Sequence, residues 1–298
     1  MSDADGGGGD GEEPLSPLRC DFEERGLARY AEVPARLSRL YGGGFGFTPP
    51  VLFANFVASA DGVVALGPGI PSAGSVISGR DPADRFVMAL LRACADAVVI
   101  GAGTLRATPG HVWTPEHVCG WAAAELRALR SSLGRAPRPR LVVLTRTGDL
   151  PPDHPGLAGD VLVATTPAGA VRARLRLPAA EVVTTPAADG VDLVHLFARL
   201  RARGWGTILT EGGPVLVGEL LRARLLDQLF LTVAPVLAGR QDGRHRPGVV
   251  DGVELLPRDR SPLALLSVRR HASHLFLRYA CAERAEPDRS RERATRSR

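Results

Sequence analysis

The sequence predicts an α/β fold in which a mixed, mostly parallel sheet is flanked by helices and ends in an antiparallel hairpin. Short, nearly continuous apolar runs such as 51–58 alternate with segments whose apolar residues recur every three or four positions. This is the pattern of doubly buried strands joined by amphipathic helices. Late in the chain, residues 263–269 and 274–280 instead alternate apolar and polar residues around a short turn, which predicts the hairpin.

Two segments precede the predicted sheet. Residues 1–17 are acidic and rich in glycine, so we expect them to be disordered. Residues 18–49 carry apolar residues three and four apart, which predicts a helical N-terminal extension interrupted at Pro34. The main domain is then expected to span residues 50–281, and the Arg-rich residues 282–298 are expected to form a second disordered tail.

Within the main domain, strands and helices are expected to alternate. The predicted strands are 51–58, 95–100, 140–145, 160–165, 181–184, the run that ends at Glu211, 229–236, and the two arms of the hairpin. The predicted helices begin near Asp81, span 121–133, 167–176 and 191–203, and begin again at Pro214. The start at Asp81 is the clearest, because Asp81, Pro82 and Asp84 supply an N-cap, a proline at the first helical position and an acid in the first turn.

The composition excludes several classes of function. The 298 residues include no lysine, so neither a Walker A phosphate loop nor a Schiff base with pyridoxal phosphate is available. The four cysteines are scattered and no H-x-E or H-E-x-x-H occurs, so we expect no metal site and a reducing, cytoplasmic location. No apolar stretch reaches the roughly 18 residues of a membrane span. The net charge of +5 is modest, and we expect neither a membrane nor a nucleic-acid partner.

The stretch 207–218, TILTEGGPVLVG, is the strongest local signal for a ligand site. An apolar run ends in Glu211, Gly212 and Gly213 follow, and Pro214 opens a predicted helix. Glycines without a Cβ would let a ligand approach the backbone, and free amides at the positive end of a helix would attract a phosphate. An ordinary turn that needs glycine to bend has the same sequence, but the adjacent carboxylate of Glu211 favours a site.

Other polar residues follow predicted strands at the same edge, because the carboxyl ends of parallel strands meet there. Residues 101–104 read GAGT, an incomplete dinucleotide fingerprint, since Arg106 replaces the third glycine. Thr145 and Arg146 offer a hydroxyl and a guanidinium that could clamp a 2′-phosphate, the alternative being a solvated loop arginine. Asp61 is a candidate proton donor or substrate anchor, the alternative being the cap of a turn.

Four motifs occur in order along the chain: NFVASADG from Asn55, LRA…DAVVIGAGT from Leu91, TEGGP from Thr210, and LD…AP…G from Leu226. Together they resemble the reductase domain of bacterial riboflavin-biosynthesis pyrimidine deaminase/reductases (the RibD C-terminal domain), within the dihydrofolate-reductase-like superfamily, over residues 51–280. The resemblance implies a dihydrofolate-reductase-like fold, NADPH as hydride donor and a homodimer. It also implies a small-molecule substrate, a ribosylaminopyrimidine phosphate whose ribose is reduced to a ribityl chain.

The same resemblance implies roles for individual residues. Those expected to contact the substrate are Asn55, Ser59, Arg92 and Glu211. Those expected to contact the cofactor are Ser78, Gly101, Thr104, Thr145, Gly212, Gly213, Pro214, Leu216 and Gly218, to which we add Arg146 from its charge and position. Asp61, or a water that it orients, is expected to supply the proton.

The sequence departs from the family's pattern in two places. The deaminase signature, H-x-E with P-C-x-x-C, does not occur. After Thr104 the family usually continues with acidic residues and then a substrate-contacting arginine, whereas this chain reads Arg106-Ala-Thr-Pro-Gly-His-Val-Trp113.

We therefore expect an NADPH-dependent reductase of a pyrimidine-type substrate. Two alternatives stay open: a non-catalytic nucleotide-binding relic of the same fold, and a dihydrofolate-reductase-like enzyme with a different substrate. A nucleic-acid-binding role for the basic tail is disfavoured by the acids within 282–298.

Overall fold

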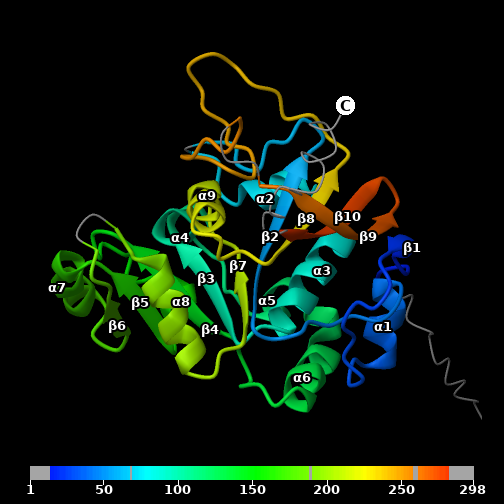
Figure 1. Ribbon diagram of the computed structural model, residues 1–298, viewed down its shortest axis with the longest axis horizontal. Helices are drawn as coiled ribbons and strands as arrows, with labels where there is room; N and C mark the ends of the chain where they lie inside the picture. Colours follow the sequence, from blue (N-terminus) through cyan, green and yellow to red (C-terminus); the bar gives the residue numbers. More distant parts are fainter. Residues whose placement is uncertain (1–13, 68, 188–189, 258–260, 282–298) are drawn as a thin grey trace, which may run out of the picture.

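The computed structural model describes residues 14–67, 69–187, 190–257 and 261–281 (Figure 1). It contains a ten-stranded sheet in the order β1-β9-β10-β8-β2-β7-β3-β4-β5-β6. From β8 to β6 neighbouring strands run parallel, whereas β10, β9 and β1 pair antiparallel. The predicted mixed, mostly parallel sheet with a C-terminal hairpin is confirmed.

The bounds of the elements are as follows. The strands are β1 Arg19–Glu23, β2 Val51–Ser59, β3 Ala97–Gly101, β4 Arg140–Thr145, β5 Val161–Thr165, β6 Glu181–Thr184, β7 Thr207–Thr210, β8 Gln228–Ala234, β9 Leu263–His271 and β10 His274–Cys281. The α-helices are α1 Ala35–Tyr41, α2 Ala73–Ile77, α3 Pro82–Ala93, α4 Ala102–Ala107, α5 Pro115–Val118, α6 Ala123–Ser132, α7 Pro167–Arg176, α8 Leu193–Ala202 and α9 Pro214–Arg222. Two short 3₁₀ turns lie at Gly120–Ala122 and Pro155–Leu157.

Helix α3 shows how the local sequence determines an element. The carboxylate of Asp81 accepts hydrogen bonds from the backbone N–H groups of Ala83 (2.9 Å) and Asp84 (3.0 Å). Pro82 occupies the first helical position, where no N–H partner is needed. Helices α2, α4 and α5, with four to six residues each, were not predicted, because they are too short to show a 3.6-residue period.

The sheet separates two apolar cores. Along β3, Val98 and Ile100 face the core that holds residues of α1, α3 and α6, while Ala97 and Val99 face the core that holds α8 and α9. All four side chains are fully buried. Burial on both faces is what makes β3 a continuous apolar run in sequence.

The N-terminal extension differs from its prediction. Within residues 18–49 the helix is limited to α1, and residues Arg19–Glu23 form a strand, β1, that pairs antiparallel with β9. Most β1 side chains are exposed, so the strand has no buried face and therefore no period that could reveal it. Leu15, predicted to be disordered, is 2% exposed and packs in the core. Residues 1–13 and 282–298, also predicted to be disordered, lie outside the described residues.

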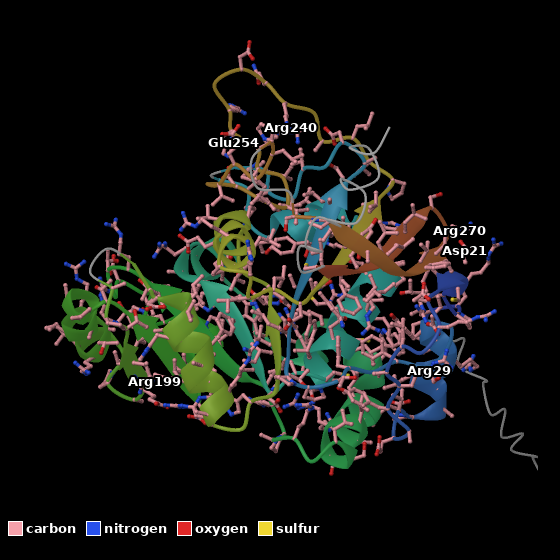
Figure 2. The ribbon with its side chains drawn as sticks, viewed as in Figure 1. Asp21, Arg29, Arg199, Arg240, Glu254 and Arg270 are labelled. Atoms are coloured by element: carbon pink, nitrogen blue, oxygen red, sulfur yellow. The ribbon has the colours of Figure 1, made fainter. Side chains whose placement is uncertain are left out.

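Strand β1 forms one edge of the sheet and carries charged side chains. Figure 2 shows Asp21 beside Arg270 of β9, and the carboxylate of Asp21 lies 3.4 Å from Arg270 Nε and also pairs with Arg19. Charges along an edge strand discourage pairing with another sheet.

The long segment between β8 and β9 rises over the carboxyl ends of β2 and β8 (Figure 1). It is tied to the loop after β2, where the N–H of Val64 donates to the carbonyl of Pro247 (3.0 Å). No helix of the described ranges is long and apolar enough to cross a bilayer. Within the same ranges, no group of three or more His, Cys, Asp or Glu side chains could hold a metal ion.

Candidate active site

Two cavities adjoin at the carboxyl edge of the parallel strands. The larger has a volume of about 1180 Å³ and the smaller about 460 Å³. The walls that they share are formed by Ala65, Thr104, Ala107, Gly213 and Pro214. Because these residues belong to both walls, the cavities adjoin beside the turn after β7, and we refer to the two together as the crevice.

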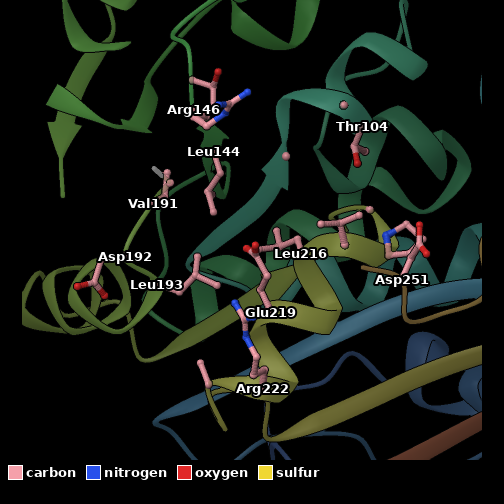
Figure 3. Close-up of a pocket in the computed structure, with 18 of the residues that line it drawn as sticks. Thr104, Leu144, Arg146, Val191, Asp192, Leu193, Leu216, Glu219, Arg222 and Asp251 are labelled. Atoms are coloured by element: carbon pink, nitrogen blue, oxygen red, sulfur yellow. The ribbon is translucent and has the colours of Figure 1, made fainter. Parts of the chain in front are cut away.

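The larger cavity contains most of the residues predicted to contact the cofactor. Those lining it are Gly101, Thr104, Thr145, Arg146, Gly213, Pro214 and Leu216. Figure 3 shows this cavity, with Arg146 directly after β4, Thr104 on α4, and Glu219 and Arg222 on α9. The side chain of Arg146 is exposed, and no described residue pairs with its guanidinium. An unpaired guanidinium at the wall of a large cavity suits an anionic group on a ligand.

The glycine pair after β7 provides fewer free amides than predicted. The N–H of Gly212 donates to Thr210 Oγ1 (3.2 Å), so it is not available to a phosphate. A Cβ on Gly212 would lie 2.4 Å from Leu216 Cδ2, so any side chain here would displace the side chain of Leu216 on α9. Gly213, the N-cap of α9, has ordinary φ and ψ angles, and its Cβ would lie 3.6 Å from Thr104 Oγ1. Gly213 lines both cavities, whereas Gly212, predicted to contact the cofactor, lines only the smaller one.

Two other predicted cofactor residues lie elsewhere. Gly218 lines neither cavity: a Cβ there would be 2.7 Å from the carbonyl oxygen of Asp251, so this glycine lets the β8–β9 segment pack on α9. Ser78 lines the smaller cavity rather than the larger one, and it is 3% exposed.

The smaller cavity contains Asn55, Arg92 and Glu211, three of the four residues predicted to contact the substrate. Glu211 directly follows β7, and its N–H donates to the carbonyl of Val99 on β3 (3.1 Å), which fixes its backbone at the sheet edge. Its carboxylate forms a two-pronged ion pair with Arg92, with Nε–Oε1 at 2.8 Å and Nη2–Oε2 at 2.6 Å. The side chains are 10% and 1% exposed, so this is a buried ion pair of fixed geometry.

Arg92 has no N–H left for a ligand. Besides its two bonds to Glu211, Nη1 donates to the carbonyls of Val112 (3.3 Å) and Thr114 (3.2 Å). Nη2 also lies 2.7 Å from His111 Nε2. A guanidinium has five N–H groups, and all five have acceptors here. Arg92 is therefore a positioning residue that holds Glu211, His111 and the loop that contains His111. The geometry does not indicate the direct contact between Arg92 and the substrate that was predicted.

Ser59 and Asp61 line neither cavity, which corrects their predicted roles. Ser59 Oγ donates to the Asp61 carboxylate (2.6 Å), which also accepts the N–H groups of Ala238 (2.9 Å) and Gly239 (2.8 Å). The bond from Ser59, followed by that from Ala238, lowers the pKa of Asp61 to about 2. A carboxyl that stays ionised cannot donate a proton near neutral pH, so Asp61 fastens the turn after β2 to the turn after β8.

Sequence reasoning missed Asp84, which lines the smaller cavity and is 5% exposed. Burial raises the pKa of its carboxyl to about 6, against hydrogen bonds from the hydroxyls of Thr232 and Ser78. The sequence predicts Asp84 only as an acid in the first turn of a helix, yet Asp84 precedes Val87 and Leu91 by three and seven positions. That spacing puts an acid on the buried face of a helix, which is the signal that could have identified it.

Sequence reasoning also missed His111, which lines the smaller cavity with Trp113. Both belong to the segment where the sequence departs from the family's pattern after Thr104. The departure itself was the available signal, because a changed segment beside the family's other motifs points to changed ligand contacts.

The fold and the crevice define an α/β protein with a large and a small ligand cavity side by side at the carboxyl edge of its sheet. Residues 50–267 match the family model of the RibD C-terminal domain, and the chain belongs to this family. The predicted family is confirmed.

Similar proteins agree with this assignment. A 2,5-diamino-6-ribosylamino-4(3H)-pyrimidinone 5′-phosphate reductase of Methanothermobacter thermautotrophicus is 29% identical over 203 residues, which cover 68% of this chain and 84% of that protein. A pyrimidine reductase-like protein of Corynebacterium diphtheriae has a similar fold, with a TM-score of 0.60 at 24% identity over 78% of this chain and 92% of that one. RibD of Acinetobacter baumannii has a TM-score of 0.56 at 20% identity, covering 78% of this chain and 59% of that one.

Proposed function

We propose that this chain is an NADPH-dependent reductase of a ribosylaminopyrimidine phosphate, resembling 5-amino-6-(5-phosphoribosylamino)uracil reductase. The observation that carries the proposal is the junction of a 1180 Å³ and a 460 Å³ cavity at Gly213 and Thr104. A reductase must bring a large cofactor and a smaller substrate into contact and exclude water between them. Two cavities that share a wall meet this requirement, and the named activity of the Methanothermobacter relative supports it.

The larger cavity fits NADPH. Its volume exceeds the roughly 300–1,000 Å³ of ordinary ligand sites, as a dinucleotide requires. Gly213, at the N-terminus of α9, and the hydroxyls of Thr104 and Thr145 would hold the phosphates and riboses. The unpaired guanidinium of Arg146 would hold the 2′-phosphate that distinguishes NADPH from NADH.

When bound, NADPH supplies the hydride, and the residues of this chain supply position and protons. Glu211, held by Arg92, offers an acceptor-only carboxylate to N–H groups of a heterocycle in the smaller cavity. Reduction of a carbon–nitrogen double bond consumes one proton besides the hydride. Asp84 is the group we assign to it, because it lines the smaller cavity and its pKa of about 6 lies near working pH.

The first experiment measures NADPH binding by quenching of tryptophan fluorescence, and then NADPH oxidation with a panel of three compounds. The panel contains 2,5-diamino-6-ribosylamino-4(3H)-pyrimidinone 5′-phosphate, its deaminated uracil counterpart and dihydrofolate. We expect turnover of one ribosylaminopyrimidine. Binding without any turnover would favour the nucleotide-binding relic, and turnover of dihydrofolate alone would favour the different-substrate alternative.

The proton donor is tested separately. Asp84→Asn should lower kcat by about 10²-fold or more while leaving the KM for NADPH unchanged, since general acid catalysis contributes on that scale. Asp153→Asn, at an exposed carboxyl outside both cavities, is the matched control. Unchanged kcat in Asp84→Asn would remove Asp84 from the mechanism.

We also propose a cytoplasmic homodimer. The thiols of all four cysteines are free, which supports a reducing compartment. On the hairpin, Leu263 and Leu265 are 44% and 39% exposed, and such apolar side chains on a sheet suit contact with a second copy. Light scattering should give a dimer mass for the native chain, and Leu265→Lys should shift it toward the monomer if this surface is the contact.

A further inference from the structure

The imidazole of His111 is held in one protonation pattern by its contact with Arg92. The guanidinium Nη2 lies 2.7 Å from His111 Nε2. An arginine nitrogen can only donate, so Nε2 must accept and carries no hydrogen. The one hydrogen of the neutral ring is therefore on Nδ1.

The ring also stays neutral. Burial is the main cause and the charge of Arg92 the next, and together they lower the pKa of His111 to about 2. The neighbouring rings do not reverse this, because His117, whose ring centroid is 4.7 Å away, has its own pKa lowered by burial and by Arg92. Arg85 and His154 likewise act to lower the pKa of His111.

The Nδ1–H group faces open space. No described residue accepts a hydrogen bond from it, and it is not among the described buried polar atoms that lack a partner. His111 is also one of the residues that line the smaller cavity. A fixed donor is thus presented where we place the substrate.

We infer that His111 determines substrate specificity, by donating its Nδ1–H to an acceptor, a carbonyl oxygen or an unprotonated ring nitrogen, on the heterocycle of the substrate. The same Nη2 atom of Arg92 that holds His111 also lies 2.6 Å from Glu211 Oε2. One nitrogen therefore sets the separation of a donor, His111, and an acceptor, Glu211. The pair matches a ring that shows a carbonyl oxygen next to N–H groups, as in a 2-amino-4-oxopyrimidine. This inference rests on the proposed function and assigns recognition of the substrate's heterocycle to His111.

Two substitutions of His111 distinguish the effect of its hydrogen bonds on substrate binding from the effect of its shape. In His111→Gln, the side-chain oxygen can accept from Arg92 while the amide N–H donates to the ligand. His111→Phe keeps the ring but offers neither. We expect His111→Phe to raise the KM for the accepted ribosylaminopyrimidine roughly three- to tenfold, the value of one hydrogen bond, and His111→Gln to restore most of it. The KM for NADPH should stay the same in both, and His195→Gln, at an exposed histidine outside both cavities, is the control.

A second readout does not depend on turnover. ¹⁵N spectra of the native chain, with the His111 signals identified by their loss in His111→Gln, should show hydrogen on Nδ1 and no titration between about pH 5 and pH 8. Addition of 2-amino-4-hydroxypyrimidine as probe should shift the Nδ1–H signal. Hydrogen on Nε2, titration in this range, no response to the probe, or equal KM values for the Gln and Phe variants would each overturn the inference. Absence of NADPH oxidation with a normal His111 spectrum and probe response would instead overturn the proposed function.

Discussion

The buried carboxyl of Asp84 should make the stability of this protein depend on pH in an unusual direction. Its pKa is raised from 3.8 to about 6, so the folded chain holds a proton that the unfolded chain releases. At 1.36 kcal/mol for each unit of pKa, the difference corresponds to about 3 kcal/mol. Since the folded-state pKa is the higher one, the stabilisation is complete below about pH 4, is lost between about pH 4 and pH 6, and stays lost above that range.

Asp84→Asn removes this penalty, because a neutral amide can still bond the hydroxyls of Thr232 and Ser78. Relative to the native chain, the variant should gain about 2 kcal/mol of unfolding free energy when the pH is raised from about 4.5 to about 8. Urea unfolding followed by tryptophan fluorescence at both pH values gives the number. Asp153→Asn, which changes an exposed carboxyl, should show no such gain. Parallel curves for the native chain and Asp84→Asn would refute the idea that burial keeps this group protonated.

The remaining predictions concern the turn after β7, Arg146 and Asp61. Gly212→Ala should cost about 1–3 kcal/mol in urea unfolding, because its Cβ would lie 2.4 Å from Leu216 Cδ2, whereas Gly213→Ala, with 3.6 Å of room, should cost much less; equal costs would contradict the packing reason. Arg146→Gln should raise the KM for NADPH but not for NADH, and an equal rise for both would remove its link to the 2′-phosphate. In the native chain the low pKa of Asp61 adds stability above about pH 4 that is lost as the pH falls toward 2, so Asp61→Asn should flatten stability in that range without altering the pH profile of kcat. Loss of turnover in Asp61→Asn at full stability would restore its catalytic role.

The parallel strands could be predicted because each carries its own signal. Residues of β3 are buried on both faces of the sheet by the helices that pack on it. As a result, β3 is a short apolar run that can be recognised in the sequence without knowing its partners. The carboxyl edge could also be predicted, since parallel strands end together. Strand β1 could not, because its pairing with β9 depends on residues more than two hundred positions away and leaves no periodic pattern.

The details of the site depend on contacts that are distant in sequence. Arg92 and Glu211 are 119 positions apart, and the three-way contact with His111 appears only once α3, β7 and the segment after α4 meet. Gly212 and Gly213 cannot be told apart by local reasoning. The structure separates them, because a Cβ on Gly212 would lie 2.4 Å from Leu216 Cδ2, whereas Gly213 lines both cavities. Asp61 had two local interpretations, and the backbone N–H groups that decide between them lie on the turn after β8.

The wall formed by Thr104, Gly213 and Pro214 has a consequence for the order of events. A molecule bound in either cavity contacts residues that a molecule in the other cavity also contacts. Each occupant then alters the affinity of the other by the same factor, as thermodynamic linkage requires. If the proposed function holds, a complex with the oxidised dinucleotide should accordingly bind the pyrimidine with an affinity different from that of the empty protein.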